Sequence, residues 1–203
     1  IVLTGQRRVG KSYILRDFLE RHKGDMQTNF IYINKERKKF DAIKNNEQLN
    51  AYIDEHWVEG LHNFILIDEV QEIESWEKSV RSYRTEENTD IIITGSNSKM
   101  LSSELSTLIG GRYHEIYVQS LSYQEFLLFH ELEDNDDALS KYINYGGLPG
   151  LKRVGLDDEE FVWDYIRAVF HTVMLKDIVE RNNIRNVSFL NTLLRYFADT
   201  IGK

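Results

Sequence analysis

Short apolar runs alternate with segments of helical period over the first two thirds of the chain. These runs predict five β-strands, at 1–4, 29–34, 63–68, 90–95 and 113–118. Helical spacing is clearest at 11–22, where Ile14, Leu15, Phe18 and Leu19 share one face. Further helices are expected at 46–57 and 74–84.

Two of the strands are apolar at nearly every position, in "FILID" and "DIIIT". A strand with both faces buried has this pattern, whereas a strand with one wet face alternates. Strands of this kind, separated by helices, indicate an α/β protein with a parallel sheet that helices cover on both sides. The expected fold class is therefore α/β, with a five-stranded parallel sheet.

The pattern changes after about residue 120, where every long segment has helical spacing. The single proline, Pro149, lies in the turn cluster "YGGLPGL" between two such segments. We therefore place a boundary near residue 125, between a core at 1–125 and a smaller all-helical region at 126–203.

Composition and charge limit the classes of function that this chain can have. The 203 residues carry a net charge of −8, which argues against a surface that attracts nucleic acid everywhere. A local basic cluster in "NKERKKF" is open to two interpretations, a solvated loop or a phosphate-contacting patch. The chain has no cysteine, which excludes disulfides and thiolate metal sites and fits a reducing cytoplasm, so we expect a cytoplasmic protein. No run of 18 apolar residues exists, so we expect no membrane span.

One stretch matches a phosphate-binding loop, G-x-x-x-x-G-K-[ST], without a gap. It follows the first strand and precedes the first helix, which is the position that the motif requires. The predicted nucleotide-binding residues are Gly5, Gln6, Arg7, Arg8, Val9, Gly10, Lys11, Ser12 and the adjoining Tyr13.

Each part of this motif has a physical task. The glycines allow backbone angles closed to other residues, so the loop can turn its N–H groups inward. The following helix adds partial positive charge at its amino end. Lys11 is expected to reach the β- and γ-phosphates of ATP, and the Ser12 hydroxyl to hold Mg²⁺.

A magnesium-side carboxylate is expected on a neighbouring strand, and "FILIDEVQ" supplies it. Asp68 ends the apolar run, as a Walker B aspartate does, and is predicted as a metal ligand. Glu69 follows directly, where an acid can polarise an attacking water. The sequence therefore predicts an ATPase that uses ATP and Mg²⁺.

Other stretches resemble one group of bacterial and archaeal AAA-type ATPases. They are "ITGSN", "LIGGRYHEIYVQSLSYQEF", "YGGLPGL" and "VMLKDIVERNNIRNVSFLNTLLRYFADTIG", and together with the loop they cover nearly the whole chain. The resemblance implies an AAA core, a helical lid, and a further C-terminal region of unknown function beyond residue 203.

The resemblance also implies roles for single residues. A polar sensor residue near the γ-phosphate corresponds to Asn97 or Ser96, with Asn97 preferred. Asn34, at the end of the second strand, corresponds to the residue that restrains the catalytic glutamate, here Glu69; a turn residue is the alternative. Arg112 stands where AAA proteins place an arginine finger, which acts on a neighbouring subunit's ATP; a surface ion pair is the alternative.

Two further expectations follow from the same resemblance. Pro149 lies in the turn that contacts the nucleotide base in related ATPases, although a plain interhelical turn also fits. An assembly of several copies is expected if Arg112 acts in trans, and DNA or a protein is the expected partner of the C-terminal region. A different class stays open: a nucleotide-gated binding module with little turnover.

Overall fold

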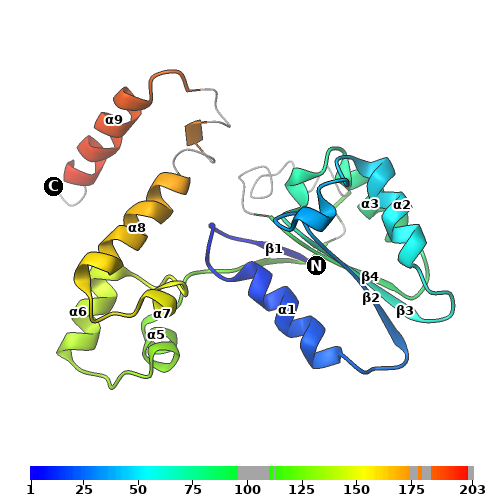
Figure 1. The fold of residues 1–203 in the computed structure, drawn as a ribbon, viewed down its shortest axis with the longest axis horizontal. Helices are drawn as coiled ribbons and strands as arrows, with labels where there is room; N and C mark the ends of the chain where they lie inside the picture. Colours follow the sequence, from blue (N-terminus) through cyan, green and yellow to red (C-terminus); the bar gives the residue numbers. More distant parts are fainter. Residues whose placement is uncertain (96–109, 112, 174–177, 180–183, 201–203) are drawn as a thin grey trace. The chain divides into compact units, whose positions relative to one another are not determined.

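The computed structural model describes residues 1–95, 110–111, 113–173, 178–179 and 184–200 (Figure 1). The chain forms two compact units, Ile1–Lys152 and Arg153–Lys203. The first unit holds the sheet and the candidate site.

Five strands form one sheet in the first unit. They are β1 (Val2–Thr4), β2 (Thr28–Asn34), β3 (His62–Asp68), β4 (Thr89–Thr94) and β5 (Glu115–Tyr117). Their order is β2-β3-β4-β1-β5, and every adjacent pair is parallel. The parallel five-stranded sheet expected from the sequence is therefore confirmed. The carboxyl ends of all five strands therefore lie at the same edge of the sheet, and polar residues lie at these ends and in the loops that follow.

Helices cover both faces of this sheet (Figure 1). One face packs on α1 (Lys11–His22), and the other on α2 (Asn46–His56) and α3 (Trp76–Tyr83). Neighbouring residues of β3 divide between the two cores, because successive side chains point to opposite faces of a strand. Leu66 joins the core beneath α1, and Ile65 and Ile67 join the core beneath α2 and α3.

Short 3₁₀ helices follow two of the strands, η1 (Lys38–Phe40) after β2 and η2 (Val70–Glu72) after β3. The ammonium of Lys35 donates to the carbonyls of Phe40 at 2.7 Å and Ile43 at 2.6 Å. Burial lowers the pKa of Lys35 from its ordinary value. One member of the basic cluster is thus a structural residue that holds the loop around η1.

The described residues after β5 form helices. They are α5 (Tyr123–His130), α6 (Asp136–Tyr145), α7 (Leu151–Val154), α8 (Glu159–Val173) and α9 (Val187–Thr200). The boundary that we placed near residue 125 falls inside α5, whereas the compact units divide after Lys152. A search of the described residues finds no helix with the length and apolarity needed to cross a bilayer.

Candidate nucleotide-binding site

The loop between β1 and α1 has the backbone shape of a phosphate cradle. Gly5, Arg8 and Gly10 have φ angles of 134°, 67° and 105°. Positive φ is open to glycine at little cost, which explains glycine at the two ends of the loop. The carbonyl of Gly10 accepts from the amide of Ile14 at 3.1 Å, so α1 begins directly behind the loop.

Gly5 is also required by close packing. A Cβ atom at this position would lie 2.2 Å from the carbonyl oxygen of Val118, which follows β5. The amide of Val118 in turn donates to the carbonyl of Thr4 at 2.8 Å. The first glycine of the motif therefore lets β5 lie against the start of the loop.

Lys11 is the buried cation of the site, with 4% of its surface exposed. Its Nζ atom donates to the carbonyl oxygens of Gly5 at 3.0 Å and Gln6 at 2.8 Å. A buried ammonium needs such partners, because it is strongly hydrated in water. These bonds hold the charge inside the curl of the loop.

Asp68, at the end of β3, is the centre of a polar cluster and is fully buried. Its Oδ1 atom accepts from the hydroxyls of Ser12 at 3.0 Å and Thr94 at 2.6 Å. Its Oδ2 atom accepts from the amide of Asn34 at 2.8 Å. Burial raises the pKa of Asp68, while the hydrogen bonds from Thr94 and Ser12 act in the opposite direction.

The pair Ser12 and Asp68 fits a magnesium ion. Both supply hard oxygen atoms, and Mg²⁺ in nucleotide sites takes one or two protein oxygens and completes its shell with water and phosphate. Among the described residues, no group of three or more His, Asp or Glu side chains could hold a metal. Ser12 and Asp68 would therefore supply the protein oxygens of a metal whose other ligands come from water and phosphate.

Asn34 contacts the first of the two acids. Its amide donates to Asp68 at 2.8 Å and to the hydroxyl of Tyr32 at 3.1 Å, because the register of the parallel strands places Asn34 beside Asp68. Its Oδ1 atom accepts from the backbone amide of Glu36 at 2.8 Å, which fits the turn-residue alternative, and its restraint of Glu69 stays a prediction. Glu69 leaves this register, because its φ of 58° turns the chain at the strand end.

Thr94 is a site residue that the sequence analysis missed. It ends β4, and its Oγ1 atom donates to Asp68 and accepts from the backbone amide of Glu69 at 3.0 Å. The available signal was a polar residue at the end of the apolar run "IIIT". The predicted residues Ser96, Asn97 and Arg112 lie outside the described residues.

Glu69 has its own side-chain partner. The Nε2 atom of Gln71 donates to Oε2 of Glu69. Gln71 belongs to η2, two positions further along the chain, and its neighbour Val70 is fully buried. The carboxylate of Glu69, the acid expected to polarise water, is therefore bound by a residue of the same turn.

Tyr13 and Pro149 were also predicted to contact the nucleotide. Tyr13 is 56% exposed, and the guanidinium of Arg16 lies 4.1 Å from the centre of its ring. Pro149 precedes α7, and its carbonyl accepts from the amide of Lys152 at 3.2 Å. These contacts fit the interhelical-turn interpretation of Pro149, and its contact with a base stays a prediction.

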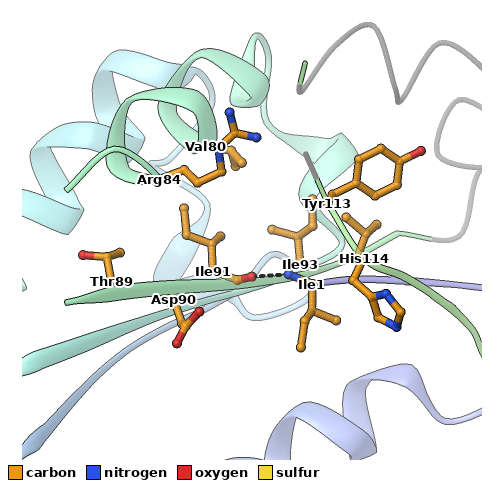
Figure 2. A pocket seen from close by; sticks show the side chains of 10 residues that line it. Ile1, Val80, Arg84, Thr89, Asp90, Ile91, Ile93, Tyr113 and His114 are labelled. Carbon is orange, nitrogen blue, oxygen red and sulfur yellow. Dashed lines mark hydrogen bonds between the residues drawn. The ribbon is translucent and has the colours of Figure 1, made fainter. Parts of the chain in front are cut away.

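A hollow lies at the opposite edge of the sheet, at the amino ends of β1 and β4 (Figure 2). Its wall includes Ile1, Ile91, Ile93 and Tyr113, and the backbone nitrogen of Ile1 donates to the carbonyl of Ile91 at 2.7 Å. Because the loop follows the carboxyl end of β1, this hollow is separate from the candidate nucleotide site.

Comparison with known proteins gives relatives along the whole chain. The chain is 35% identical over 210 residues to an uncharacterized protein of Haemophilus influenzae, covering 100% of this chain and 52% of that protein. It is 31% identical over 219 residues to an uncharacterized protein of Methanocaldococcus jannaschii, covering 99% of this chain and 47% of that one. The chain spans about half the length of these curated relatives.

The fold and the family agree with the geometry of the loop and the strand ends. The crystal structure of Cdc6p from Pyrobaculum aerophilum matches with a TM-score of 0.52 and 16% identity, over 90% of this chain and 56% of that one. At that identity the match concerns the fold. The family model described as "AAA domain" matches residues 1–127, which include the loop and all five strands. With a glycine-rich loop, a buried lysine and a strand-end aspartate in one parallel sheet, this chain belongs to the AAA domain family of P-loop ATPases.

Proposed function

We propose that this chain binds ATP with Mg²⁺ at the Gly5–Ser12 loop and hydrolyses it. The observation that carries the proposal is the 3.0 Å hydrogen bond between the hydroxyl of Ser12 and the carboxylate of Asp68. The two residues are 56 positions apart in the sequence, and they meet beside the buried ammonium of Lys11. A hydroxyl, a carboxylate and an ammonium at one strand edge are the groups that a magnesium–triphosphate needs.

Each residue has a defined task in this proposal. The amides of the loop and the start of α1 bind phosphate oxygens, and Lys11 exchanges its loop carbonyls for the β- and γ-phosphates. Ser12 and Asp68 hold Mg²⁺, which neutralises charge on the phosphates when bound. Glu69 accepts a proton from the attacking water, and Asn97 orients the γ-phosphate.

Two parts of the proposal rest on the resemblance of the sequence to AAA-type ATPases. Arg112 is proposed as an arginine finger, which requires a second copy of the chain beside the first. DNA or a protein is proposed as the partner that uses the hydrolysis, through a region outside these 203 residues.

The test compares ATP binding with ATP turnover. The wild type should bind ATP in calorimetry only weakly without Mg²⁺ and tightly with it, and should release phosphate. Lys11→Ala should lose affinity sharply, because it removes the buried ammonium that is expected to meet the phosphates. Glu69→Gln keeps the shape of the side chain and loses its charge, so it should bind ATP normally and lose turnover.

Three results would contradict parts of the proposal. Unchanged ATP affinity in Lys11→Ala would remove the loop from the nucleotide site. Full turnover in Glu69→Gln would place the base elsewhere. Tight ATP binding by a wild type that releases no phosphate, even with DNA added, would favour the nucleotide-gated binding module instead.

A further inference from the structure

The backbone around Glu69 is fixed from both sides. Its amide donates to Thr94 Oγ1 at 3.0 Å, and its φ of 58° turns the chain directly into η2. The apolar residues on either side of Gln71 in this turn are anchored, since Val70 and Ile73 are 0% and 1% exposed. The Cα atoms of Glu69 and Gln71 therefore keep one arrangement.

A glutamate side chain on a fixed backbone still has three rotatable bonds. Ordering a side chain of this length costs conformational entropy. A group that accepts a proton from water must lie within hydrogen-bond reach of that water. The turn therefore needs a second contact that selects one position of the carboxylate.

Gln71 makes such a contact, through the hydrogen bond from its Nε2 atom to Oε2 of Glu69. The other atom of its amide group, Oε1, is buried and has no hydrogen-bond partner among the described residues. A buried acceptor without a partner is unfavourable, and native structures contain few of them. Within the described part of the chain, the contact with Glu69 is thus the one that orients this amide.

We propose that Gln71 is a positioning residue for the reaction, which holds the Glu69 carboxylate in the position from which it polarises water. This inference rests on the proposed ATPase function. It differs from the role expected for Asn34, whose amide is bound to Asp68. The proposed restraint on the glutamate comes from its own turn.

The experiment replaces the hydrogen bond without changing the volume much. Gln71→Met keeps a long unbranched side chain and removes the donor. Gln48→Met is the matched control, because the Gln48 side chain accepts a hydrogen bond from the amide of Lys44 away from the site. Both variants are made in the full-length protein, and ATP turnover, ATP affinity and melting temperature are measured.

Gln71→Met should lower kcat by roughly tenfold or more, the size expected when a hydrogen bond to a charged group is lost. The KM and the ATP affinity should stay unchanged, because Gln71 acts after binding. Gln48→Met should leave kcat unchanged. A wild-type kcat in a folded Gln71→Met protein would overturn the proposal.

A double-mutant cycle separates a positioning role from a general structural one. In the Glu69→Gln background, the rate of single-turnover cleavage should be the same with and without the Gln71→Met substitution, because the carboxylate that Gln71 positions is gone. An equal fold-loss in both backgrounds would overturn the proposal. If Glu69→Gln alone retains full turnover, the proposed function fails first, and this outcome is distinguishable.

Gln71→Glu covers the case in which methionine disturbs folding. It keeps the length and polarity of the side chain but replaces the donor with a second carboxylate beside Glu69. Like charges at this separation repel, so kcat should fall at least as much as in Gln71→Met. A folded Gln71→Glu protein with the wild-type kcat would contradict the proposed role.

Discussion

The hydroxyl of Thr94 connects the two adjacent acids of the site. It donates to the Oδ1 atom of Asp68 at 2.6 Å and accepts from the backbone amide of Glu69 at 3.0 Å. One side chain at the end of β4 therefore fixes both the carboxylate proposed for Mg²⁺ and the turn that carries the proposed base. Its loss should affect both at once.

Thr94→Val keeps the branched shape and removes the hydroxyl. It leaves the Glu69 amide without its acceptor in a buried region, which typically costs about 1–3 kcal/mol. We expect a lower free energy of unfolding and a kcat at least tenfold below the wild type, from about 1.4 kcal/mol of lost transition-state stabilisation. Denaturant unfolding and phosphate release measure the two effects.

Two controls define this result. Thr94→Ser keeps the hydroxyl and should retain most of the activity. Thr85→Val removes an exposed threonine hydroxyl that donates to the carbonyl of Ser82, and it should leave turnover unchanged. A Thr94→Val protein as active as Thr94→Ser would show that the hydroxyl does not organise the site.

The buried carboxylate of Asp68 predicts a pH dependence of stability in the nucleotide-free protein. Burial raises the folded-state pKa of Asp68 above its ordinary value of 3.8. Between these two pKa values the folded protein holds a proton that the unfolded chain releases. Stability from this group is therefore lost as the pH rises through that window, and the loss is complete above the raised pKa.

Asp68→Asn cannot ionise and avoids this loss. The variant should therefore gain stability relative to the wild type as the pH rises. Its free energy of unfolding minus that of the wild type should be larger at pH 7 than near pH 4, which is about the ordinary pKa of aspartate. Urea unfolding at both pH values, without Mg²⁺ or nucleotide, measures the difference. Asp17→Asn, on the exposed side of α1, controls for the loss of one negative charge. A difference that is independent of pH would contradict the raised pKa.

Arg112 yields a prediction that depends on assembly. If its guanidinium acts on the ATP of a neighbouring copy, Arg112→Ala should keep ATP affinity and lose turnover, since arginine fingers contribute about 10³–10⁵ in rate. Mixing Arg112→Ala with Lys11→Ala in the full-length protein should restore part of the activity, because some sites then combine an intact loop with an intact finger. Mixed assemblies that remain inactive would rule out the action in trans.

The sequence predicted the parts of the molecule that local patterns determine. The apolar run 63–68 corresponds to β3 (His62–Asp68), and the helical spacing at 11–22 to α1 (Lys11–His22). The sequence also predicted the glycine-rich loop, because its glycines and its lysine lie within eight consecutive residues. A motif of this length can be recognised from the sequence, because the residues that form it are neighbours in the chain.

The contacts between the strand ends depend on register, which the sequence alone does not show. The pairing of β2 with β3 brings Asn34 to Asp68, a contact that the sequence did not predict. Thr94 was missed because its importance arises from β4 lying beside β3. Gln71 was missed because its contact depends on the left-handed turn at Glu69, an unusual conformation for that residue.

The two glycines of the loop should fail in different ways when alanine replaces them. Both have positive φ, at 134° for Gly5 and 105° for Gly10, so either alanine is strained by about 1–2 kcal/mol. Only at Gly5 does the new Cβ also meet a backbone atom, the Val118 oxygen at 2.2 Å, whereas at Gly10 nothing lies within 4 Å.

Gly5→Ala should therefore destabilise the protein more than Gly10→Ala, by a further amount of about 1–3 kcal/mol for the overpacking against β5. Both variants should bind ATP weakly, because each distorts the amides that face the phosphates. Unfolding measured without nucleotide distinguishes the two variants, because ATP affinity then does not affect their stability. Equal stability of the two variants would mean that β5 moves aside easily, and that Gly5 is needed for the shape of the loop alone.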